Sequence, residues 1–453
     1  MKRLLWAACA AGVMLTACAA FVGCGSSAKS ISSVEELYAM QSGKSYKLAC
    51  DLDLQGRAWY PLSVKNFNGN GHTISNCVVT ECDTKYSLTD CGGFFVTANN
   101  ISNVKFDSID VTLSISDMSF IGGIVGNCGD LSNVELTNCT YDFQITSTDN
   151  RIGYFGMIAG IVQKVSAVKV DNCKVDYLIR DTGRCELQFG GIAGRTDSNK
   201  GFTSSSIKNT EIKLENKSKY GGMNVGLIIG GFESYSGGLS DCVAENCTLE
   251  VIGNYTNEYT TRVGGIAGYV RYDTSLVANC VSADNDIEVI ASYGYNIGGI
   301  VGKTFAKVEN CLSDSNKLTG ATSSTRKDQF AGVGGVCGTA NNTVSKSVSQ
   351  NNEIRGTSNT QSADMLTAGL IVNPTASVAN CAVIGCTISG GHTDCFSGAC
   401  EAVFNCVVAG NTVKPNVNTV EVLDEDELDS IISKLQLDAN VWSFDDGKLA
   451  LKV

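Results

Sequence analysis

Proline, histidine and charged residues are scarce in this chain of 453 residues, and each scarcity excludes a class of protein. Three prolines are far below the roughly 5% of average proteins, which excludes a proline-rich linker or a mucin-like stalk. Two histidines leave little material for imidazole-based catalysis or a histidine-rich metal site. Only 18% of the residues are charged while 43% are apolar, which is not the composition of a disordered chain. The formal net charge of −12 argues against a nucleic-acid partner, because nucleic-acid readers usually carry a basic face.

The one long apolar run lies at the start of the chain. Residues 4–22 are mostly apolar and follow the basic residues Lys2 and Arg3, an order typical of an export signal. A membrane-spanning helix is the alternative, because about 19 apolar residues can just cross a bilayer. The segments Leu-Thr-Ala-Cys, ending at Cys18, and Phe-Val-Gly-Cys, ending at Cys24, are similar to the lipobox of bacterial lipoproteins, in which the cysteine is lipidated. We therefore expect residues 1–24 to be a signal peptide and anchor, with the lipid on Cys24 or Cys18.

A glycine pattern recurs through most of the remaining chain. It has the form Gly-x-x-x-Gly, often with a glycine pair at its start, and nine copies begin 30 to 38 residues apart between positions 92 and 368. A second pattern, usually Asn or Asp before Cys or Val, follows most copies, and a further Asn or Cys often comes about five residues later. The apolar residues at the centre of the glycine patterns are Ile124, Ile158, Ile192, Ile228, Ile266, Ile300, Val336 and Leu370.

The period and composition of these repeats favour a β-solenoid. Helical repeats of about 34 residues need two amphipathic helices in each unit, and kelch blades have a period of about 50. Glycine costs about 1 kcal/mol within a helix, and glycine pairs interrupt every unit here. We predict an all-β, right-handed parallel β-helix of about eleven coils, with equivalent residues about 4.8 Å apart. The central apolar residues then form an inward ladder, the glycines allow a tight bend or a positive φ, and the Asn positions lie in turns where their amides bond to one another.

Both ends of the repeat region carry sequence that breaks the pattern and is expected to cap the solenoid, whose ends would otherwise expose unpaired strand edges. Residues 33–40 begin with a capping box and predict a short helix. Residues 424–437 have helical apolar spacing, and Trp442, Phe444 and Leu449 predict a final strand or hairpin. The expected organisation is a signal peptide and anchor over 1–24, a tether and N-terminal cap over 25–60, the solenoid over 61–415, and a C-terminal cap over 416–453.

The glycine pattern resembles the repeat of the GLUG-motif proteins, a bacterial family of exported chains with Gly-Gly-Ile/Leu-Val/Ala-Gly repeats. The lead-in around residues 46–74, including Trp59, and the closing segment 442–449 are similar to segments of the same family. The resemblance implies an exported solenoid of the kind found in adhesin-like proteins and beside the peptidase domain of IgA-cleaving metallopeptidases. The chain contains no His-Glu-x-x-His motif, so no peptidase is expected.

Other residues that could carry chemistry have structural explanations. His72 is expected in a lead-in turn and His392 on a surface loop, without a partner histidine for a metal. The cysteines are expected to pack inward as small apolar residues, although disulfides stay possible in an exported chain and zinc remains a weaker alternative. We predict no metal and no cofactor. The cysteines spaced as C-x4-C are Cys77 and Cys82, Cys242 and Cys247, Cys381 and Cys386, and Cys395 and Cys400.

Tyrosines are concentrated in one part of the chain, between residues 220 and 295. Packing between coils is one explanation, and an aromatic face for a glycan or protein ligand is the other, because exposed tyrosine offers flat apolar area and a hydroxyl. The candidate ligand face consists of Tyr255, Tyr259, Tyr269, Tyr272, Tyr293 and Tyr295.

These features predict a surface-exposed binding or adhesion protein of the bacterial cell envelope that presents its solenoid to a glycan or protein ligand. We expect a monomer that is attached to the membrane through an N-terminal lipid and that is not an enzyme. A passive structural spacer and a polysaccharide-active β-helix enzyme are the alternatives, because a fold by itself does not fix a function.

Overall fold

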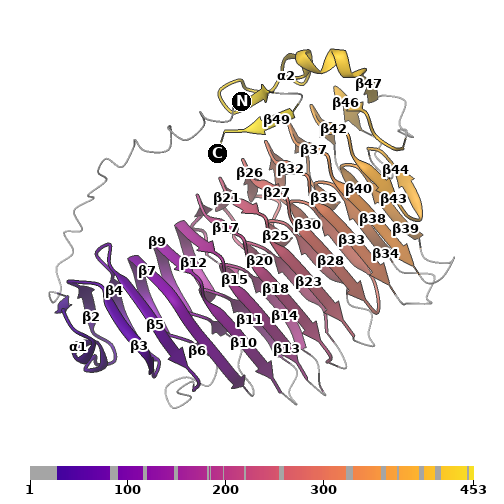
Figure 1. Cartoon of the computed structure of the whole chain (residues 1–453). Coiled ribbons are helices and arrows are strands. Elements are labelled where there is room, and N and C mark those ends of the chain that lie inside the picture. The colour runs from indigo at the N-terminus through magenta and orange to yellow at the C-terminus, as the bar shows by residue number, and fades with distance from the viewer. Residues whose placement is uncertain are drawn as a thin grey trace, which may run out of the picture.

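Parallel strands stacked along one axis make up nearly all of the computed structural model, which confirms the predicted all-β parallel β-solenoid (Figure 1). One sheet contains 37 strands and a second contains 10, and the chain ends in a two-stranded antiparallel hairpin. The structure describes residues 28–81, 90–115, 120–146, 151–180, 183, 185–196, 198–218, 221–254, 260–322, 330–358, 364–374, 377–396, 402–413, 420–445 and 448–452.

The ten-stranded sheet lies just before the glycine bends, and each coil adds one strand to it. Its eight inner strands pair on both sides, which corresponds to about eight complete turns rather than the expected eleven. The strands are β6 (Asp90–Gly92), β8 (Phe120–Gly122), β11 (Arg151–Gly156), β14 (Cys185–Gly190), β19 (Met223–Gly226), β24 (Thr261–Gly264), β29 (Tyr295–Gly298), β34 (Phe330–Gly334), β39 (Asp364–Ala368) and β44 (His392–Asp394).

After each bend the chain enters the large sheet. In the first coils the strand after the bend continues through the following turn as one long strand. In later coils the same stretch of chain consists of separate short strands. The long strands are β7 (Phe95–Ile115), β9 (Val125–Thr137) and β12 (Ala159–Asp171). The short strands directly after a bend are β15 (Ala193–Thr196), β20 (Ile229–Phe232), β25 (Ala267–Val270), β30 (Val301–Thr304), β35 (Cys337–Ala340) and β40 (Ile371–Pro374).

Two turns then carry the chain around each coil. Before the first turn lie β16 (Phe202–Thr203), β21 (Gly238–Ser240), β26 (Leu276–Ala278), β31 (Lys307–Glu309), β36 (Val344–Ser345), β41 (Val378–Ala379) and β45 (Val403–Phe404). Between the turns lie β17 (Ser206–Lys208), β22 (Val243–Glu245), β27 (Val281–Ala283), β32 (Leu312–Asp314), β37 (Val348–Gln350), β42 (Ala382–Ile384) and β46 (Cys406–Ala409). After the second turn lie β10 (Thr140–Ile145), β13 (Lys174–Ile179), β18 (Glu211–Asn216), β23 (Thr248–Gly253), β28 (Asp286–Ala291), β33 (Lys317–Thr322), β38 (Glu353–Ser358) and β43 (Thr387–Ser389).

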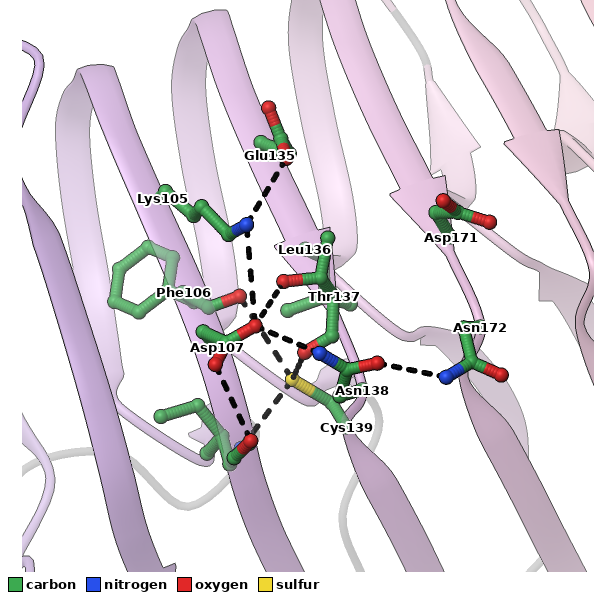
Figure 2. Close-up of polar contacts among 12 residues, drawn as sticks. Lys105, Phe106, Asp107, Glu135, Leu136, Thr137, Asn138, Cys139, Asp171 and Asn172 are labelled. Atoms are coloured by element: carbon green, nitrogen blue, oxygen red, sulfur yellow. Dashed lines mark hydrogen bonds and ion pairs between the residues drawn. The ribbon is translucent and has the colours of Figure 1, made fainter.

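Asparagine occupies these turns as predicted, because the turn residue has a positive φ that asparagine tolerates better than most residues. Asn138 and Asn172 have φ of 56° and 51°. The Asn172 Nδ2 donates to Asn138 Oδ1 at 2.7 Å, and Asn138 Nδ2 donates to Asp107 Oδ1 at 2.9 Å (Figure 2). The amides therefore form a ladder along the outside of the coils.

The predicted inward ladder is confirmed, because all eight central apolar residues of the glycine patterns are completely buried. Of the two explanations expected for the glycines, the tight bend is the one found, because none of the pattern glycines has a positive φ among the described residues. They are needed because the backbones approach closely: a Cβ on Gly264 would lie 2.1 Å from the Ala267 carbonyl oxygen.

The N-terminal cap forms as expected around helix α1 (Val34–Tyr38). The Ser33 Oγ accepts a hydrogen bond from the Glu36 amide at 3.2 Å, and Leu37 is completely buried. Parallel pairing already begins at β1, ahead of the expected solenoid start at residue 61. The lead-in strands are β1 (Lys29–Ile31), β2 (Ser45–Leu48), β3 (Leu52–Ala58), β4 (Leu62–Asn68) and β5 (Thr73–Val79).

The C-terminal segment continues the solenoid and then turns back along its side. β47 (Val420–Val422) still pairs in parallel with β46, beyond the expected limit at residue 415. The 3-10 helix η1 (Glu425–Ser430), α2 (Ile431–Lys434) and the hairpin of β48 (Trp442–Asp445) and β49 (Lys448–Leu451) follow. The Gln350 side chain bonds to both backbone groups of Leu449, at 2.8 and 3.1 Å, so the hairpin covers the outer face of earlier coils rather than only the open end. Within the described part of the chain, no helix is long and apolar enough to cross a membrane.

Candidate functional site

The glycine bends bring two outward-facing rows of side chains together on one side of the solenoid. The first row lies two positions before each bend glycine, and strand pairing aligns its members from coil to coil: Phe120, Tyr154, Gln188, Asn224, Arg262 and Asn296. The second row follows the last glycine of each pattern: Asn127, Ile161, Arg195, Gly231, Tyr269, Lys303 and Thr339. A third row lies two positions further on and includes Gln163, Glu233, Arg271 and Phe305. We call these three rows the bend strip.

Contacts across the bend show that the first two rows face each other. The Arg195 Nη1 donates to the Tyr154 hydroxyl at 2.6 Å, and Thr339 Oγ1 lies 2.9 Å from Asn296 Oδ1. The Arg262 guanidinium lies 5.0 Å from the centre of the Tyr269 ring. The bend strip is therefore one continuous surface in which polar, aromatic and basic groups from several coils meet.

A buried carboxylate lies at the centre of the bend strip. Glu233 is only 5% exposed, and its Oε2 lies 2.7 Å from Arg271 Nη1 and 3.2 Å from Arg195 Nη2. Gln188 Nε2 donates to its other oxygen at 3.4 Å. Two guanidinium groups compensate the cost of burying one carboxylate, because a buried charge needs close partners. The hydrogen bond to Glu233, and then the negative charge of Glu233, raises the pKa of Arg271.

Two tyrosines form a flat aromatic surface beside this charge cluster. The rings of Tyr235 and Tyr272 stack with their centres 3.8 Å apart at an interplanar angle of 27°, and Tyr235 is 58% exposed. The Arg271 guanidinium lies 5.5 Å from the centre of the Tyr272 ring. The hydrogen bond with Tyr235, and then burial, raises the pKa of the Tyr272 hydroxyl, so Tyr272 stays neutral near pH 7.

Of the described tyrosines that were predicted to form a ligand face, some lie at the surface and others are buried. Tyr269 and Tyr272 do lie on the outer surface, half-buried within or beside the bend strip. Tyr293 is partly buried and packs against the core. Tyr295 was assigned wrongly, because it is completely buried and its ring fills the space above Gly320, where an added Cβ would lie 2.4 Å from the ring. Its strand register turns it inward, directly beside the buried residues Thr261 and Ala331 in the same row of the sheet.

Several predicted residues lie outside the described part of the chain. Tyr255 and Tyr259 belong to this group, as do the two candidate lipid-bearing cysteines, Cys18 and Cys24. Tyr235 is exposed and lies within the tyrosine-rich region 220–295, but the sequence did not predict it as part of the ligand face.

Sequence reasoning missed the charged residues of the bend strip, although a signal for them was present. Aligning the copies of the glycine pattern places Arg262 at a fixed offset before the first glycine and Arg195 directly after the last one. Since the repeats of a solenoid stack in register, fixed offsets become spatial rows. The side chains in these rows differ from coil to coil, so no conserved residue type marked them as a site.

A polar groove extends the bend strip toward the N-terminal coils. It has a volume of about 460 Å³ and is lined by Thr97, Ala98, Asn99, Asn100, Asn127, Gly129, Asp130, Gln163 and Lys200. Asn127 and Gln163 also belong to the bend strip, so the groove and the strip are continuous. The Lys200 Nζ lies 2.9 Å from Asp130 Oδ1, and amides supply most of the other polar groups.

The cysteines are structural within the described part of the chain. Fifteen of the described cysteines are free, and all of these but Cys50 are buried, as the packing interpretation predicted. Burial raises the pKa of the Cys77, Cys247 and Cys337 thiols to about 12, so they are neutral near pH 7 and poor nucleophiles. Several thiols also bond to the backbone: Cys381 Sγ donates to the Ala379 carbonyl at 3.3 Å and accepts from the Ser347 amide at 3.5 Å. Among the described residues, no cluster of metal-binding side chains is present.

Neither histidine is among the residues that define the bend strip, although strand pairing continues its first row from Asn296 through Gly332 and Leu366 to His392. His72 Nδ1 lies 3.2 Å from Asp51 Oδ1, and the Thr73 amide donates to the same carboxylate oxygen at 2.9 Å, so His72 belongs to a lead-in turn as expected. His392 is exposed at the start of β44, the end strand of the ten-stranded sheet.

Comparison with known proteins identifies solved structures but no sequence family. No family model matches the chain, and no curated protein matches its sequence. The chain is similar over 94% of its length to 92% of a putative immunoglobulin A1 protease from Bacteroides ovatus, with 14% identity and a TM-score of 0.27. It is also similar over 85% of its length to 94% of the mannuronan C-5 epimerase AlgE6 A-module from Azotobacter vinelandii, with 10% identity and a TM-score of 0.36.

Proposed function

We propose that this protein is a non-catalytic binding protein of the bacterial cell envelope that holds a glycan chain along the bend strip. The stacked Tyr235–Tyr272 pair, of which Tyr235 is exposed, lies next to two arginines and a carboxylate and is the observation that carries the proposal. Flat aromatic rings cover the apolar face of a sugar, and neighbouring amides and guanidinium groups can bond to its hydroxyls. The GLUG-like repeats and the lipobox-like N-terminus support the same proposal, because both indicate an exported and anchored chain.

The shape of the bend strip supports a polymeric ligand. Its rows run from coil to coil, so similar positions recur about every 4.8 Å along the solenoid. The amide-lined groove around Asn127 and Gln163 extends this surface beyond the tyrosines. A linear glycan can therefore contact several coils at once, and each contact adds to its retention.

The state of Glu233 supports binding rather than catalysis. Glycoside hydrolysis usually needs two carboxyl groups that flank the scissile bond. Glu233 is the one carboxylate in the described positions of the three rows between Cys185 and Phe305, and its oxygens are held by Arg195, Arg271 and Gln188. This arrangement positions the arginines and leaves Glu233 without a free oxygen for proton transfer.

The proposal is tested by measuring retention of the full-length, detergent-solubilised protein on a glycan array. Replacing Tyr235 and Tyr272 together by Ala should weaken binding of any retained glycan by about tenfold or more, as expected for aromatic anchor residues. The melting temperature should change little, because Tyr235 is largely exposed. The control is Tyr60→Ala, since Tyr60 is 63% exposed and lies in the lead-in, away from the bend strip.

Three outcomes would contradict the proposal. Equal retention of the double variant and the Tyr60 control would show that the tyrosine pair is not the binding site. Shortening of a bound glycan during incubation would show an enzyme. Failure of the wild-type protein to retain any glycan or protein on broad arrays would favour a structural spacer.

A further inference from the structure

The third row of the bend strip has a gap in the first coils. Strand pairing aligns these coils, so that Asn99, Gly129 and Gln163 occupy successive positions of the row. Gly129 supplies no side chain, and an added Cβ would lie 2.3 Å from the Asn99 carbonyl oxygen. The amides of Asn99 and Gln163 therefore flank a place that is two coil steps wide, about 10 Å between their backbones. This place is part of the polar groove of about 460 Å³.

The side chains that line this groove are suited to hydroxyl groups. The amides of Asn99 and Asn127 are exposed, and their side chains form no hydrogen bond with another residue that the structure describes. Asp130 and Lys200 pair with each other at 2.9 Å, and Lys200 also donates to Gln163 Oε1 at 3.4 Å. An amide both donates and accepts hydrogen bonds, as does a sugar hydroxyl. The volume of the groove is within the range of sites that hold small ligands, so a sugar unit fits.

The corner of the coil between the second row and the first turn becomes longer directly beside the groove. In five successive coils this corner consists of residues 128–130, 162–164, 196–201, 232–238 and 270–276. Since the strands on both sides of the corner stay in register, the additional residues project outward. Lys200 belongs to the first long corner and reaches back to Asp130. Tyr235 and Tyr272 belong to the next two, so the groove lies beside a ridge that carries the tyrosine pair.

The groove and the tyrosine pair are three coil steps apart. Strand pairing leads from Asn127, in the groove, to Gly231 in three steps. Tyr235 follows Gly231 by four residues on the same coil. Three steps of ~4.8 Å give a separation of about 14 Å along the axis of the solenoid. A sugar unit of a linear glycan is about as long as one step, so a chain with one unit at each place has about two units between them.

We propose that the groove is a second subsite for the glycan, in which Asn127 and Gln163 bind the hydroxyl groups of one sugar unit. The Tyr235–Tyr272 pair contacts another unit of the same chain. This inference rests on the proposed function and specifies its ligand as a linear glycan of about four or more sugar units. Two linked subsites retain one chain more strongly than either subsite does alone, because the second contact forms within a complex that already exists.

The test measures how the affinity of the full-length protein, in detergent, depends on the length of the ligand. The probes are cello-oligosaccharides, chito-oligosaccharides and galacturonate oligomers, each from about two to about eight units long. The groove variant is Asn127→Ala with Gln163→Ala, and its melting temperature should stay unchanged because both side chains are exposed. The control is Gln144→Ala with Asn254→Ala, which also removes two exposed amides but lies outside the bend strip and the groove.

We expect the dissociation constant of the wild type for at least one series to fall by about tenfold or more between about two and about five units, and then to change little. The groove variant should lose this fall but keep the wild-type affinity for the shortest oligomers, which need only the tyrosine pair. The control should keep the fall. The Tyr235/Tyr272 variant should lose it, because one of the two linked contacts is missing.

The inference is overturned if the affinity of the wild type does not depend on the length of the oligomer, or if the wild type binds none of the three series. It is also overturned if the groove variant and the control behave alike. Failure of the proposed function is a separate result, judged by the Tyr235/Tyr272 variant on the array. A glycan whose binding depends on the tyrosine pair but not on the groove amides would keep the binding function and remove only the second subsite.

Discussion

At the scale of single residues, the turns depend on side chains that tolerate a left-handed backbone. The second turn of each coil has one such residue, with φ of 56° at Asn138 and 51° at Asn172. In the last two coils glycine takes this position, at Gly385 and Gly410, with φ of 60° and 61°. Asparagine adds the amide ladder that glycine cannot provide (Figure 2). The turn residue must therefore first tolerate the left-handed backbone, and a side chain that bonds to the next coil is a second requirement.

Substitutions at Asn172 should separate these two contributions. Asn172→Gly keeps the left-handed conformation and loses only the exposed amide bond, so the free energy of unfolding should fall by less than about 1 kcal/mol. Asn172→Ala loses the same bond and adds the left-handed penalty of about 1–2 kcal/mol. Denaturant unfolding of both variants measures the difference. Equal stability of the two variants would show that the backbone conformation is not what the turn selects.

At the scale of the structural element, the glycine bend determines both packing and the position of the bend strip. The bend glycines lie where neighbouring backbones leave no space for a side chain. A Cβ on Gly265 would lie 2.1 Å from the Gly299 carbonyl oxygen and 2.2 Å from the Ser282 hydroxyl. The tight bend in turn brings the row of Arg262 against the row of Tyr269. The same glycines thus stabilise the coil and bring two rows of the bend strip together.

Gly265→Ala should therefore destabilise the solenoid, by about 1–3 kcal/mol if the neighbouring coils can shift to relieve the clash. The control is Gly153→Ala, because Gly153 lies within β11 of the ten-stranded sheet, where an added Cβ would meet its nearest atom at 3.9 Å. Thermal and denaturant unfolding of both variants provide the measurement. If the two substitutions cost the same, close backbone approach is not the reason for glycine at the bend.

At the scale of the whole molecule, the C-terminal segment works as a lateral cover. The outward row between the two turns is charged in the first coils, with Lys105 beside Glu135, and becomes apolar in later coils, at Leu312 and Val348. The C-terminal segment packs on this apolar part, and Trp442 is 1% exposed there. The Trp442 Nε1 also approaches Asn310 Oδ1 at 3.4 Å. The cover explains how a solenoid can keep apolar side chains on its outer face without exposing them to water.

Trp442→Ala should loosen this cover and destabilise the later coils by about 3–5 kcal/mol, a typical loss for a large buried aromatic side chain. Hydrogen exchange should increase around Leu312 and Val348, while the coils near Ile124 keep their protection. The control is Phe404→Ala, because Phe404 is an aromatic residue of the same region that is 61% exposed. Uniform loss of protection along the whole chain would contradict a local cover.

The sequence by itself determined the solenoid, its inward apolar ladder and its asparagine turns. These features follow from interactions that repeat in every coil, so the same residue types recur at a regular spacing and can be recognised without coordinates. The prediction was less accurate where two different physical reasons could account for the same residue type at a position. The bend glycines are an example, because either a positive φ or close backbone approach requires glycine, and only the structure shows that close approach is the reason.

Tertiary structure alone decided the chemistry of the surface. Tyr154, Arg195 and Glu233 are far apart in the chain and differ in type from their counterparts in other coils, so periodicity gives no sign that they meet. The same holds for Gln350 and Leu449, which are 99 residues apart and bond to each other. The direction of Tyr295, too, follows from the register of its strand, which turns it into the core. A repeat fixes which positions are neighbours in space, whereas the stacking of particular side chains fixes what those neighbours can bind.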